Sequence, residues 1–402
     1  MKILMVNKFL YPRGGSESYM LSLSEHLVKL GHEVEFFGMY DDANTVGNRV
    51  GLTTQNMDFH STGLFRFLYP FKILYSLEAK KKIMQVIDAF KPDLVHMNNI
   101  NFQLTPSIID GVKKKGIPLV QTVHDYQMIC PNHLLYNFEK NTPCEACVNH
   151  SKFACIRNKC IHGSLVKSIL GVIEAHLYAW RKTYKKVDLF ICPSRFLEGK
   201  LLGAKGYYQG KTKTIHNFIN KEQFHAADRD TKPYIAFVGR LSKEKGIENL
   251  AGAATLLPEY TFAVAGSGPD EALLSGISNV KLEGFLTGDA LTEFVGNAKL
   301  LILPSVCYEN CPLSILEAHC MGVPVVTMNS GGMAELVQDG VNGSLVDLPT
   351  PEGIAQKLRE IMENETYYQS LRENCKHEKD RIMSVETYAE QLIREYEALV
   401  AR

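Results

Sequence analysis

Two glutamates in the second half of the chain, Glu309 and Glu317, stand eight positions apart with Pro312 between them. Eight residues of continuous helix would separate the two carboxylates by about 12 Å and turn them to different faces, so they do not form an acid–base pair on one helix. Proline favours the first position of a helix. We therefore expect Glu309 in a loop and Glu317 within the first two helical turns, where they can grip two separate parts of an elongated ligand.

The helix start itself is a second candidate contact for a ligand. Free backbone amides at the N-terminus of a helix attract anionic groups. The residues that lead into this helix and begin it are the expected contacts: Asn310, Cys311, Pro312 and Leu313. The alternative is that Glu309 lies in solvent and Glu317 forms a surface salt bridge.

Two cations follow a short apolar run earlier in the same half of the chain. Arg240 comes directly after this run and Lys245 follows five residues later. Two positive charges held in place can neutralise a diphosphate. The neighbouring glycines, Gly239 and Gly246, allow the backbone to approach a ligand closely. The alternative is a charged loop whose side chains are solvated.

Glycine pairs follow apolar runs in both halves. Gly14 and Gly15 can turn backbone amides toward a phosphate or a sugar ring, and Gly266 and Gly268 form a similar turn. Neither pair completes the G-x-G-x-x-G fingerprint of dinucleotide-binding proteins. A nicotinamide-dependent enzyme is therefore poorly supported.

Short apolar runs alternate with helical patterns along the chain, which predicts an α/β architecture with two doubly wound parallel sheets. The pattern restarts near residue 217. We expect a first domain over 1–216, interrupted by a cysteine-rich insertion at 130–162, and a second domain over 217–379. An amphipathic C-terminal helix within 380–402 is expected to pack back on the first domain. In such sheets ligands bind outside the carboxyl ends of the strands, where the glycine turns lie.

The charge of the 402-residue chain is zero overall but uneven along the sequence. Up to residue 215 there are 28 Lys and Arg against 17 Asp and Glu, and the remainder has 16 against 27. A basic half suits phosphate groups or an anionic membrane surface; alternatively, the opposite charges help the two domains face each other. Zero net charge and the absence of a recognisable module argue against nucleic-acid binding.

Neither a membrane-spanning run of about 18 apolar residues nor a signal-peptide core is recognisable in the sequence. With ten cysteines, this favours a reducing, cytoplasmic location. The segment 64–75 mixes aromatic, aliphatic and cationic residues, and lysine clusters at 80–82 and 113–115 add charge. Such mixtures lie at membrane interfaces, so we expect peripheral contact with the anionic inner face of a membrane. The alternative is a core helix with a basic exposed face.

Five cysteines crowd the insertion. Cys144 and Cys147 have zinc-knuckle spacing, and Cys155 with Cys160 completes four thiolates. Cys130, His150 or His162 could replace one of them. We expect a structural zinc that orders the insertion, because a short segment of low apolar content orders poorly by itself. Free thiols or an iron–sulfur cluster are the alternatives.

In this order and spacing the motifs resemble, over nearly the whole chain, the family-four retaining glycosyltransferases of the GT-B fold, which have two Rossmann-like domains facing across a cleft. The first half carries a Gly-Gly-x-Glu opening at Gly14 and two strands, with His96 and His124, that match the two cleft-lining histidine strands of the family. The second half carries the remaining matches: Gly239-Arg240, Lys245-Gly246, Gly266-Ser-Gly-Pro269, Gly284-Phe285-Leu286, Glu309, Glu317-Ala318, Gly322-Val-Pro-Val-Val326 and Gly331-Gly332.

The resemblance implies a role for each matching residue. Glu309 would hold hydroxyls of the donor sugar, and Glu317 the ribose hydroxyls of a UDP or GDP sugar. Arg240 and Lys245 would stabilise the leaving diphosphate electrostatically, so the transfer would need no metal and no cofactor. His124 would lie near the donor sugar and the incoming hydroxyl, and Phe285 and Leu286 on the nucleoside side. The alternative to a role for His124 is a hydrogen-bonded core histidine.

The function expected from these residues is retaining transfer of a hexosyl group to a glycan or a polyprenyl-diphosphate-linked acceptor, in cell-surface polysaccharide synthesis. A sugar-nucleotide epimerase of similar shape would bind the nucleotide but need no acceptor. A non-catalytic nucleotide-sugar sensor is a third class. The presence of both the cation pair and the two glutamates favours the transferase.

Overall fold

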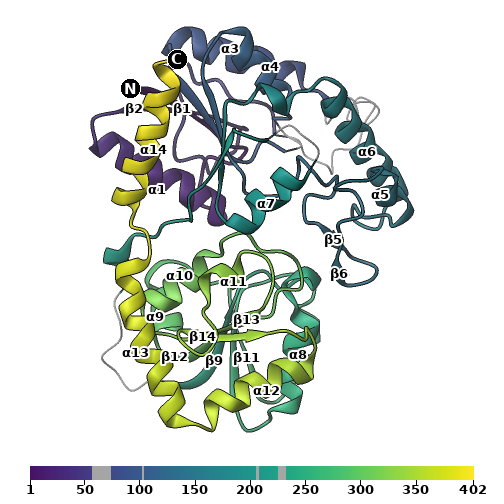
Figure 1. Cartoon of the computed structure of the whole chain (residues 1–402), viewed down its shortest axis with the longest axis vertical. Coiled ribbons are helices and arrows are strands. Elements are labelled where there is room, and N and C mark those ends of the chain that lie inside the picture. The colour runs from purple at the N-terminus through teal and green to yellow at the C-terminus, as the bar shows by residue number, and fades with distance from the viewer. Residues whose placement is uncertain (57–73, 102–103, 205–207, 225–231) are drawn as a thin grey trace. The chain divides into compact units, whose positions relative to one another are not determined.

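The structure is a computed structural model that describes residues 1–56, 74–101, 104–204, 208–224 and 232–402. The chain divides into two compact units (Figure 1). The first unit contains Met1–Leu135, Glu145–His216 and Val385–Arg402, and the second contains Tyr136–Cys144 and Asn217–Ser384. The cysteine-rich segment is therefore shared between the two units.

The first unit is built on a six-stranded parallel sheet with the order β2-β1-β3-β4-β7-β8. Its central strands are short apolar runs that are buried, as expected for a sheet covered on both faces. The strands are β1 (Lys2–Val6), β2 (Glu33–Phe37), β3 (Leu94–Met97), β4 (Leu119–Thr122), β7 (Leu189–Cys192) and β8 (Thr212–Thr214).

Helices flank this sheet, and several begin at a serine that caps the first turn. The side chains of Ser76, Ser164 and Ser194 each accept a hydrogen bond from an amide three residues later. The helices are α1 (Gly15–Lys29), α3 (Leu77–Phe90), α4 (Ser107–Lys114), α5 (Phe153–Arg157), α6 (Leu165–Trp180) and α7 (Arg195–Gly203), with a 3₁₀ turn at Tyr184–Lys186.

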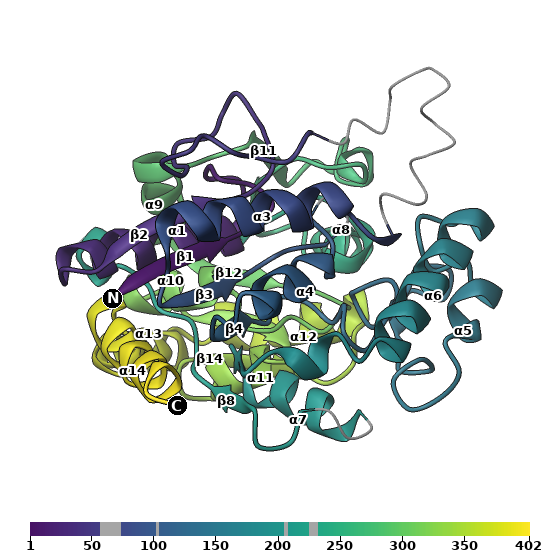
Figure 2. The same cartoon turned by 90° about the horizontal axis from the view of Figure 1, so that it is seen from above.

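The last helix of the chain, α14 (Val385–Val400), completes the core of the first unit. It packs along α1, and Figures 1 and 2 both show the two helices side by side. The Tyr388 hydroxyl lies 2.7 Å from that of Tyr19 on α1. The Tyr396 hydroxyl lies 2.5 Å from His96 Nδ1 on β3. Both α14 tyrosines are fully buried.

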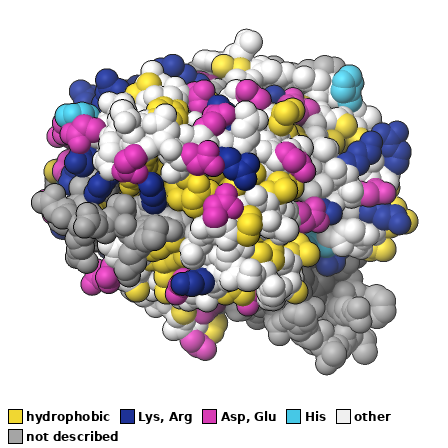
Figure 3. All heavy atoms as spheres, turned by 90° about the horizontal axis from the view of Figure 1, so that it is seen from below, with side chains coloured by type: hydrophobic (Ala, Val, Ile, Leu, Met, Phe, Trp, Pro, Cys, Tyr) yellow, Lys and Arg dark blue, Asp and Glu magenta, His cyan; other side chains and the backbone are white. Residues whose placement is uncertain are grey.

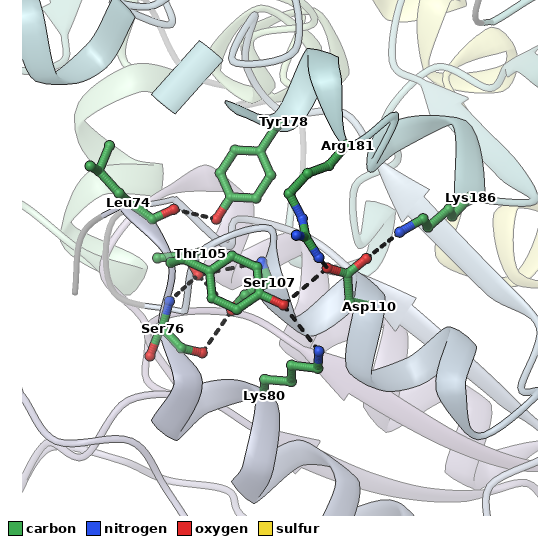
Figure 4. A network of polar contacts seen from close by, with 10 residues as sticks. Leu74, Ser76, Lys80, Thr105, Ser107, Asp110, Tyr178, Arg181 and Lys186 are labelled. Carbon is green, nitrogen blue, oxygen red and sulfur yellow. Dashed lines mark hydrogen bonds and ion pairs between the residues drawn. The ribbon is translucent and has the colours of Figure 1, made fainter. Parts of the chain in front are cut away.

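A buried carboxylate fixes the C-terminal end of α6 (Figure 4). Asp110 on α4 accepts hydrogen bonds from Arg181, at 2.8 Å, and from Lys186. Burial raises the pKa of Asp110, but these two cations hold it below its ordinary value. The Tyr178 hydroxyl donates to the Leu74 carbonyl at 2.6 Å. Helix α6 is therefore held against α4 and the start of α3 by several oriented contacts.

The second unit repeats the architecture with a sheet of order β11-β10-β9-β12-β13-β14, again parallel throughout. Its strands are β9 (Lys232–Val238), β10 (Thr261–Ala265), β11 (Val280–Gly284), β12 (Ala298–Leu303), β13 (Val325–Met328) and β14 (Gly343–Val346). The doubly wound parallel arrangement predicted for both halves is thus confirmed.

The helices of the second unit surround a core drawn from both faces of this sheet. They are α8 (Ile247–Leu256), α9 (Gly288–Gly296), α10 (Leu313–Cys320), α11 (Met333–Leu336), α12 (Pro351–Met362) and α13 (Glu365–Arg381), with 3₁₀ turns at Lys221–Gln223, Lys243–Lys245 and Glu271–Leu273. A hairpin of β5 (Tyr136–Asn137) and β6 (Thr142–Pro143) belongs to the same unit. In the hairpin, Asn141 Nδ2 donates to Glu248 Oε2 at 2.9 Å.

The structure bears on two sequence-based expectations, one about a membrane-spanning helix and one about membrane contact of the segment 64–75. Of the helices that the structure describes, none is both long and apolar enough to span a bilayer. Most of the segment at 64–75, for which membrane contact was predicted, lies outside the described residues.

Candidate active site

The candidate residues of the second unit gather at the carboxyl edge of its sheet. Arg240 and Lys245 follow β9, Gly266 follows β10, and Phe285 follows β11. The loop that contains Glu309 joins β12 to α10. Because all of these strands are parallel, their carboxyl ends meet at one edge, which is where ligands bind in sheets of this type.

Lys245 and Glu309 form an ion pair at the centre of this edge. Lys245 Nζ lies 2.5 Å from Glu309 Oε1, and Ser305 Oγ donates to the same oxygen at 2.9 Å. Burial alone would raise the pKa of Glu309, but Lys245 and Ser305 hold it below its ordinary value. Burial lowers the pKa of Lys245, and the Glu309 charge more than reverses this effect. Both groups are therefore charged at neutral pH.

Close backbone contacts hold together the loops that carry Lys245 and Glu309. Gly246 has φ +76°, and a Cβ there would lie 1.9 Å from the Pro304 carbonyl oxygen after β12. The Val306 and Cys307 amides donate to the Glu244 carbonyl at 3.0 and 3.2 Å, and the Gly332 amide donates to the Glu309 carbonyl at 2.7 Å. Only glycine fits at position 246, because any side chain would overlap the neighbouring backbone.

Two further charged side chains at this edge have no partner among the described residues. Arg240 is exposed, and no acidic group pairs with it there. Glu317 lies on α10, and burial raises the pKa of its carboxyl to about 7. Glu317 is half-buried, and a carboxylate that is partly removed from water and lacks a hydrogen-bond donor is unfavourable unless a ligand supplies one. These two residues are the ones most open to a ligand that donates hydroxyls and carries negative charge.

The start of α10 differs slightly from the sequence-based expectation. The helix begins at Leu313, and Pro312 occupies the capping position before it without a side-chain cap. The first amides of the helix therefore have no capping side chain. The Cys311 side chain lies in a small apolar cluster with Ile219 and Leu316, so only its backbone is available to a ligand. Asn310 is half-buried beside it.

The glycine turns after β10 and β11 have different surroundings. A Cβ at Gly266 would lie 1.9 Å from the Gly239 carbonyl oxygen, and one at Gly268 would lie 2.2 Å from that of Leu241. These glycines thus let the turn pack on the Arg240 loop, whatever else they contact. Phe285 is 72% exposed, and Leu286 beside it is partly buried.

In the first unit, the Gly-Gly-x-Glu opening is fixed by a network of neutral and acidic groups. Gly14 precedes α1, which begins at Gly15. Glu17 is buried and accepts hydrogen bonds from Asn7 Nδ2 and Ser16 Oγ, both at 3.0 Å. The loop that follows β1 is therefore rigidly tied to the first turn of the helix.

The two histidines that end neighbouring strands have different surroundings. His124 is partly buried, its Nε2 lies 3.0 Å from Asn98 Oδ1, and its ring packs edge-on against Tyr19. Burial lowers the pKa of His124 to about 4, so the ring is neutral at pH 7. His96 is fully buried, and Tyr396 and Thr122 engage both of its nitrogens. The expectation that His96 lines a cleft is wrong, because its side chain lies in the core under α14.

A cavity of about 150 Å³ is lined in part by the segment that follows His124, beginning at Gln127. Its lining includes Gln127, Glu174 and Lys182 and the rings of Tyr178, Tyr184 and Tyr208. Glu174 is only 6% exposed, and its Oε1 has no hydrogen-bond partner. Burial raises the pKa of this carboxyl to about 8. Sequence reasoning missed Glu174, although it is the only acidic residue of α6.

The predicted zinc ligands are not brought together as a set. Cys147, Cys155 and Cys160 share a small buried cluster with Val172, whereas Cys144 lies outside it and is partly exposed. The buried Cys130 thiol interacts electrostatically with Cys147 and Cys160, and burial raises its pKa to about 12. Within the described residues, no three His, Cys, Asp or Glu side chains have an arrangement suited to a metal ion.

Sequence comparison divides the chain into two familiar parts. The profile described as Glycosyl transferases group 1 matches residues 218–378. The profile described as Glycosyltransferase Family 4 matches residues 13–223. Together the two profiles span almost the whole chain, and their boundary lies close to the one between the two units.

Individual relatives extend the same pattern. An uncharacterised 42.6 kDa protein of the cps region of Klebsiella pneumoniae is 26% identical over 84% of this chain and 87% of its own. The amylovoran biosynthesis glycosyltransferase AmsK of Erwinia amylovora is 29% identical over 48% of this chain and 50% of its own. The crystal structure of HepE from Anabaena with UDP and glucose superposes with a TM-score of 0.72 at 19% identity, covering 99% of this chain and all of that one.

Proposed function

Because this chain belongs to the family 4 glycosyltransferases of the GT-B fold, we propose that it transfers a sugar from a nucleotide diphosphate to a glycan or lipid-linked acceptor with retention of configuration. The observation that supports this most strongly is the edge where the Lys245–Glu309 pair lies beside the partnerless Arg240 and Glu317. The proposed pathway is the synthesis of a cell-surface polysaccharide, and the relative named for amylovoran biosynthesis is consistent with a biosynthetic role.

The donor diphosphate is the proposed partner of the two cations. Arg240 is exposed and can turn toward a phosphate without breaking another contact among the described residues. Lys245 is already charged and held by Glu309. As the glycosidic bond breaks, negative charge grows on the leaving diphosphate, and fixed cations stabilise that charge. Two such cations supply what a divalent metal supplies elsewhere, so we propose that the transfer needs no metal.

The two glutamates are the proposed contacts of the donor's hydroxyls. Glu309 would accept from the sugar, since its second oxygen is not bound by Lys245 or Ser305. Glu317 would accept from the ribose, which gives its buried carboxylate the donors it lacks in the free protein. The amides that begin α10 would lie along the same ligand. UDP and GDP both fit these contacts.

His124 and the neighbouring cavity are the proposed acceptor side. A neutral imidazole can donate a hydrogen bond to a sugar hydroxyl or accept one from it, without adding charge to the site. In the cavity, Glu174 and the tyrosine rings offer a hydroxyl acceptor and apolar faces, a combination that suits a saccharide. The acceptor hydroxyl would attack the donor carbon while the carbon–oxygen bond to the diphosphate breaks, and the hydroxyl proton would pass to the departing diphosphate oxygen.

Calorimetry of the full chain with EDTA present tests the donor side. UDP, GDP, their sugars and NAD are titrated in turn. Metal-free binding of one nucleoside diphosphate supports the proposal and identifies the base. Binding of NAD alone, or of no nucleotide, overturns it. Conversion of the donor sugar to an epimer without any acceptor would instead identify an epimerase.

We also propose a structural zinc in the cysteine segment. Three thiols already share one cluster, and Cys130 interacts electrostatically with two of them. Thiolates are the ligands that structural zinc prefers. Because no three such side chains of the described residues are already arranged for a metal, zinc would have to draw Cys147, Cys155 and Cys160 together with Cys130, which would replace Cys144. Metal analysis of the purified chain should find one zinc per chain, and less than about a tenth of an equivalent would exclude it.

A further inference from the structure

Helix α6 exposes an apolar stripe on the side of the helix opposite the Glu174 cavity. Val166, Ile169, Ile173 and Trp180 are 66, 37, 46 and 78% exposed, and Leu165 is 49% exposed. Their spacing of three, four and seven residues places them along one face of the helix. The opposite face, with Glu174 and Tyr178, is buried. The apolar stripe is therefore the face of α6 that borders solvent.

Neighbouring elements extend this stripe and hold it in place. Phe153 on α5 is 63% exposed, and its ring lies 5.9 Å from that of His176 on α6. Figures 1 and 2 both show α5 beside α6 at one edge of the first unit. The Asp110 network anchors the C-terminal end of α6. On the face in Figure 3, by contrast, hydrophobic side chains are interspersed with acidic and basic ones.

The charges around the stripe have one sign. Between Ala146 and Val187 the sequence has eight Lys and Arg and a single acidic residue, Glu174, which faces the cavity. Five of these cations are exposed and have no acidic partner among the described residues: Arg157, Lys159, Lys167, Lys182 and Lys185. Arg157, Lys159 and Lys167 lie near the start of α6 in the sequence, and Lys182 and Lys185, which also line the Glu174 cavity, follow its end. Cations are therefore present at both ends of the stripe.

We infer that the α5–α6 face, defined by Phe153, Val166, Ile169, Ile173 and Trp180 with its five flanking cations, docks onto an anionic phospholipid bilayer. An exposed apolar stripe inserts at the level of the headgroups, and cations around it pair with anionic lipids. An aromatic residue such as Trp180 favours this boundary, because its ring is apolar and its N–H is polar. A soluble acidic protein would match the cations but would not need so many aliphatic side chains.

The inference deepens the proposed function, because a bilayer is where a lipid-linked acceptor would be found, but it does not depend on catalysis. The cavity side of α6 would remain within the first unit while the opposite face contacts lipid. Donor binding tests the function, and lipid binding tests this surface. A negative result for donor binding therefore does not contradict lipid binding at this surface, and a negative result for lipid binding does not contradict the proposed function.

Trp180 is the only tryptophan of the chain, so its fluorescence reports on this face alone. The full-length protein is mixed with phosphatidylcholine vesicles, with or without phosphatidylglycerol, and binding is measured by co-sedimentation. We expect binding at least about tenfold stronger with phosphatidylglycerol, weakening between about 50 and 500 mM salt. Trp180 emission should shift to the blue and be quenched by brominated acyl chains.

A paired substitution provides the matched test. The double variant Val166→Glu, Ile173→Glu should lower the fraction of protein bound to vesicles about tenfold or more, because the two introduced carboxylates would have to enter the lipid. Leu348→Glu, at a leucine 67% exposed in the second unit, should leave it unchanged. Far-UV circular dichroism checks that the variants fold. If they do not fold, the quenching of Trp180 in the wild-type protein still tests the inference.

Three outcomes would overturn the inference. The first is no sedimentation with anionic vesicles at low salt. The second is binding without any change in Trp180 emission, which would place the lipid contact elsewhere. The third is Trp180 already shielded in the free protein and the chain dimeric by ultracentrifugation, which would assign the stripe to a second copy of the chain.

Discussion

The two units have the same parallel sheet, yet the polar residues at the ends of their strands are used differently. In the second unit these residues are charged: Lys245 pairs with Glu309, while Arg240 and Glu317 have no partner among the described residues. In the first unit they bind one another. Glu17 is satisfied by Asn7 and Ser16, and His124 is neutral and contacts Asn98.

This difference teaches what each edge can do. A carboxylate that is partly removed from water and has no hydrogen-bond donor, such as Glu317, is unfavourable in the free protein and indicates a ligand that supplies one. Arg240 is exposed and solvated, so it is free to turn toward such a ligand. A neutral network that is already satisfied offers shape and a few hydrogen bonds, and attracts no strong charge. In the proposed function, the second unit would therefore take the nucleoside diphosphate and the first unit a neutral sugar hydroxyl.

The largest effect is expected at Glu309. Glu309→Ala should reduce kcat/KM for transfer by about 10²–10³, because a contact that orients the donor sugar is lost. Nucleotide binding should be largely kept, as shown by calorimetry with UDP or GDP. Glu352→Gln, at an exposed glutamate on α12, is the control. Equal losses in transfer and in nucleotide binding would mean that Glu309 only holds Lys245 in place.

Lys245→Ala should weaken both nucleotide binding and transfer by about tenfold to a hundredfold, since a charged hydrogen bond to the diphosphate is removed. Lys243 is the matched control, because it lies in the same 3₁₀ turn and its nearest acid is Glu248, at 3.8 Å. If Lys243→Ala weakens binding as much as Lys245→Ala, the diphosphate is attracted by the general positive charge of this loop and not by a specific contact with Lys245.

A smaller effect should appear in the pH dependence of nucleotide binding. Burial raises the pKa of Glu317 to about 7, and only its ionised form accepts hydrogen bonds from both ribose hydroxyls. Affinity should therefore fall about tenfold as the pH drops from about 8 to about 6. Calorimetry across this range measures it. In Glu317→Gln this step should vanish; an unchanged pH profile would assign the titration to the nucleotide itself.

The smallest effect is expected in the first unit, where contacts are neutral. Glu174→Gln should raise KM for the acceptor about threefold to tenfold, because one hydrogen bond to a hydroxyl is altered. Initial rates at saturating donor measure it, and nucleotide binding should not change. Glu25→Gln, at an exposed position on α1, is the control. An unchanged acceptor KM would separate the cavity from the acceptor site.

Much of the fold follows from local patterns, and the exceptions have physical causes. The buried strands are short apolar runs that end at glycine or polar residues, so each was predictable by itself. The edge strands β8 and β14 were not predicted. β8 consists of Thr-Lys-Thr, which has no apolar signal, and its position is set by pairing with β7.

The candidate site was predictable in residue types but not in contacts. Arg240, Lys245, Glu309 and Glu317 stand out by type and spacing, whereas the Lys245–Glu309 pair joins residues 64 positions apart. His96 and His124 look alike in sequence, and only the packing of α14 separates a core residue from a candidate site residue. Cys144 and Cys147 have the spacing of a zinc-binding pair, but in the structure they belong to different units.

The buried tyrosines of α14 have a consequence for how the protein is made. Tyr388 and Tyr396 fill the core of the first unit and bind Tyr19 and His96, yet they follow the whole second unit in the sequence. The first unit must therefore wait, with part of its core open, until α14 has been synthesised. The second unit can complete its own core earlier, because its residues end at Ser384. A nascent chain stopped before α14 should thus carry a finished second unit and an unfinished first one.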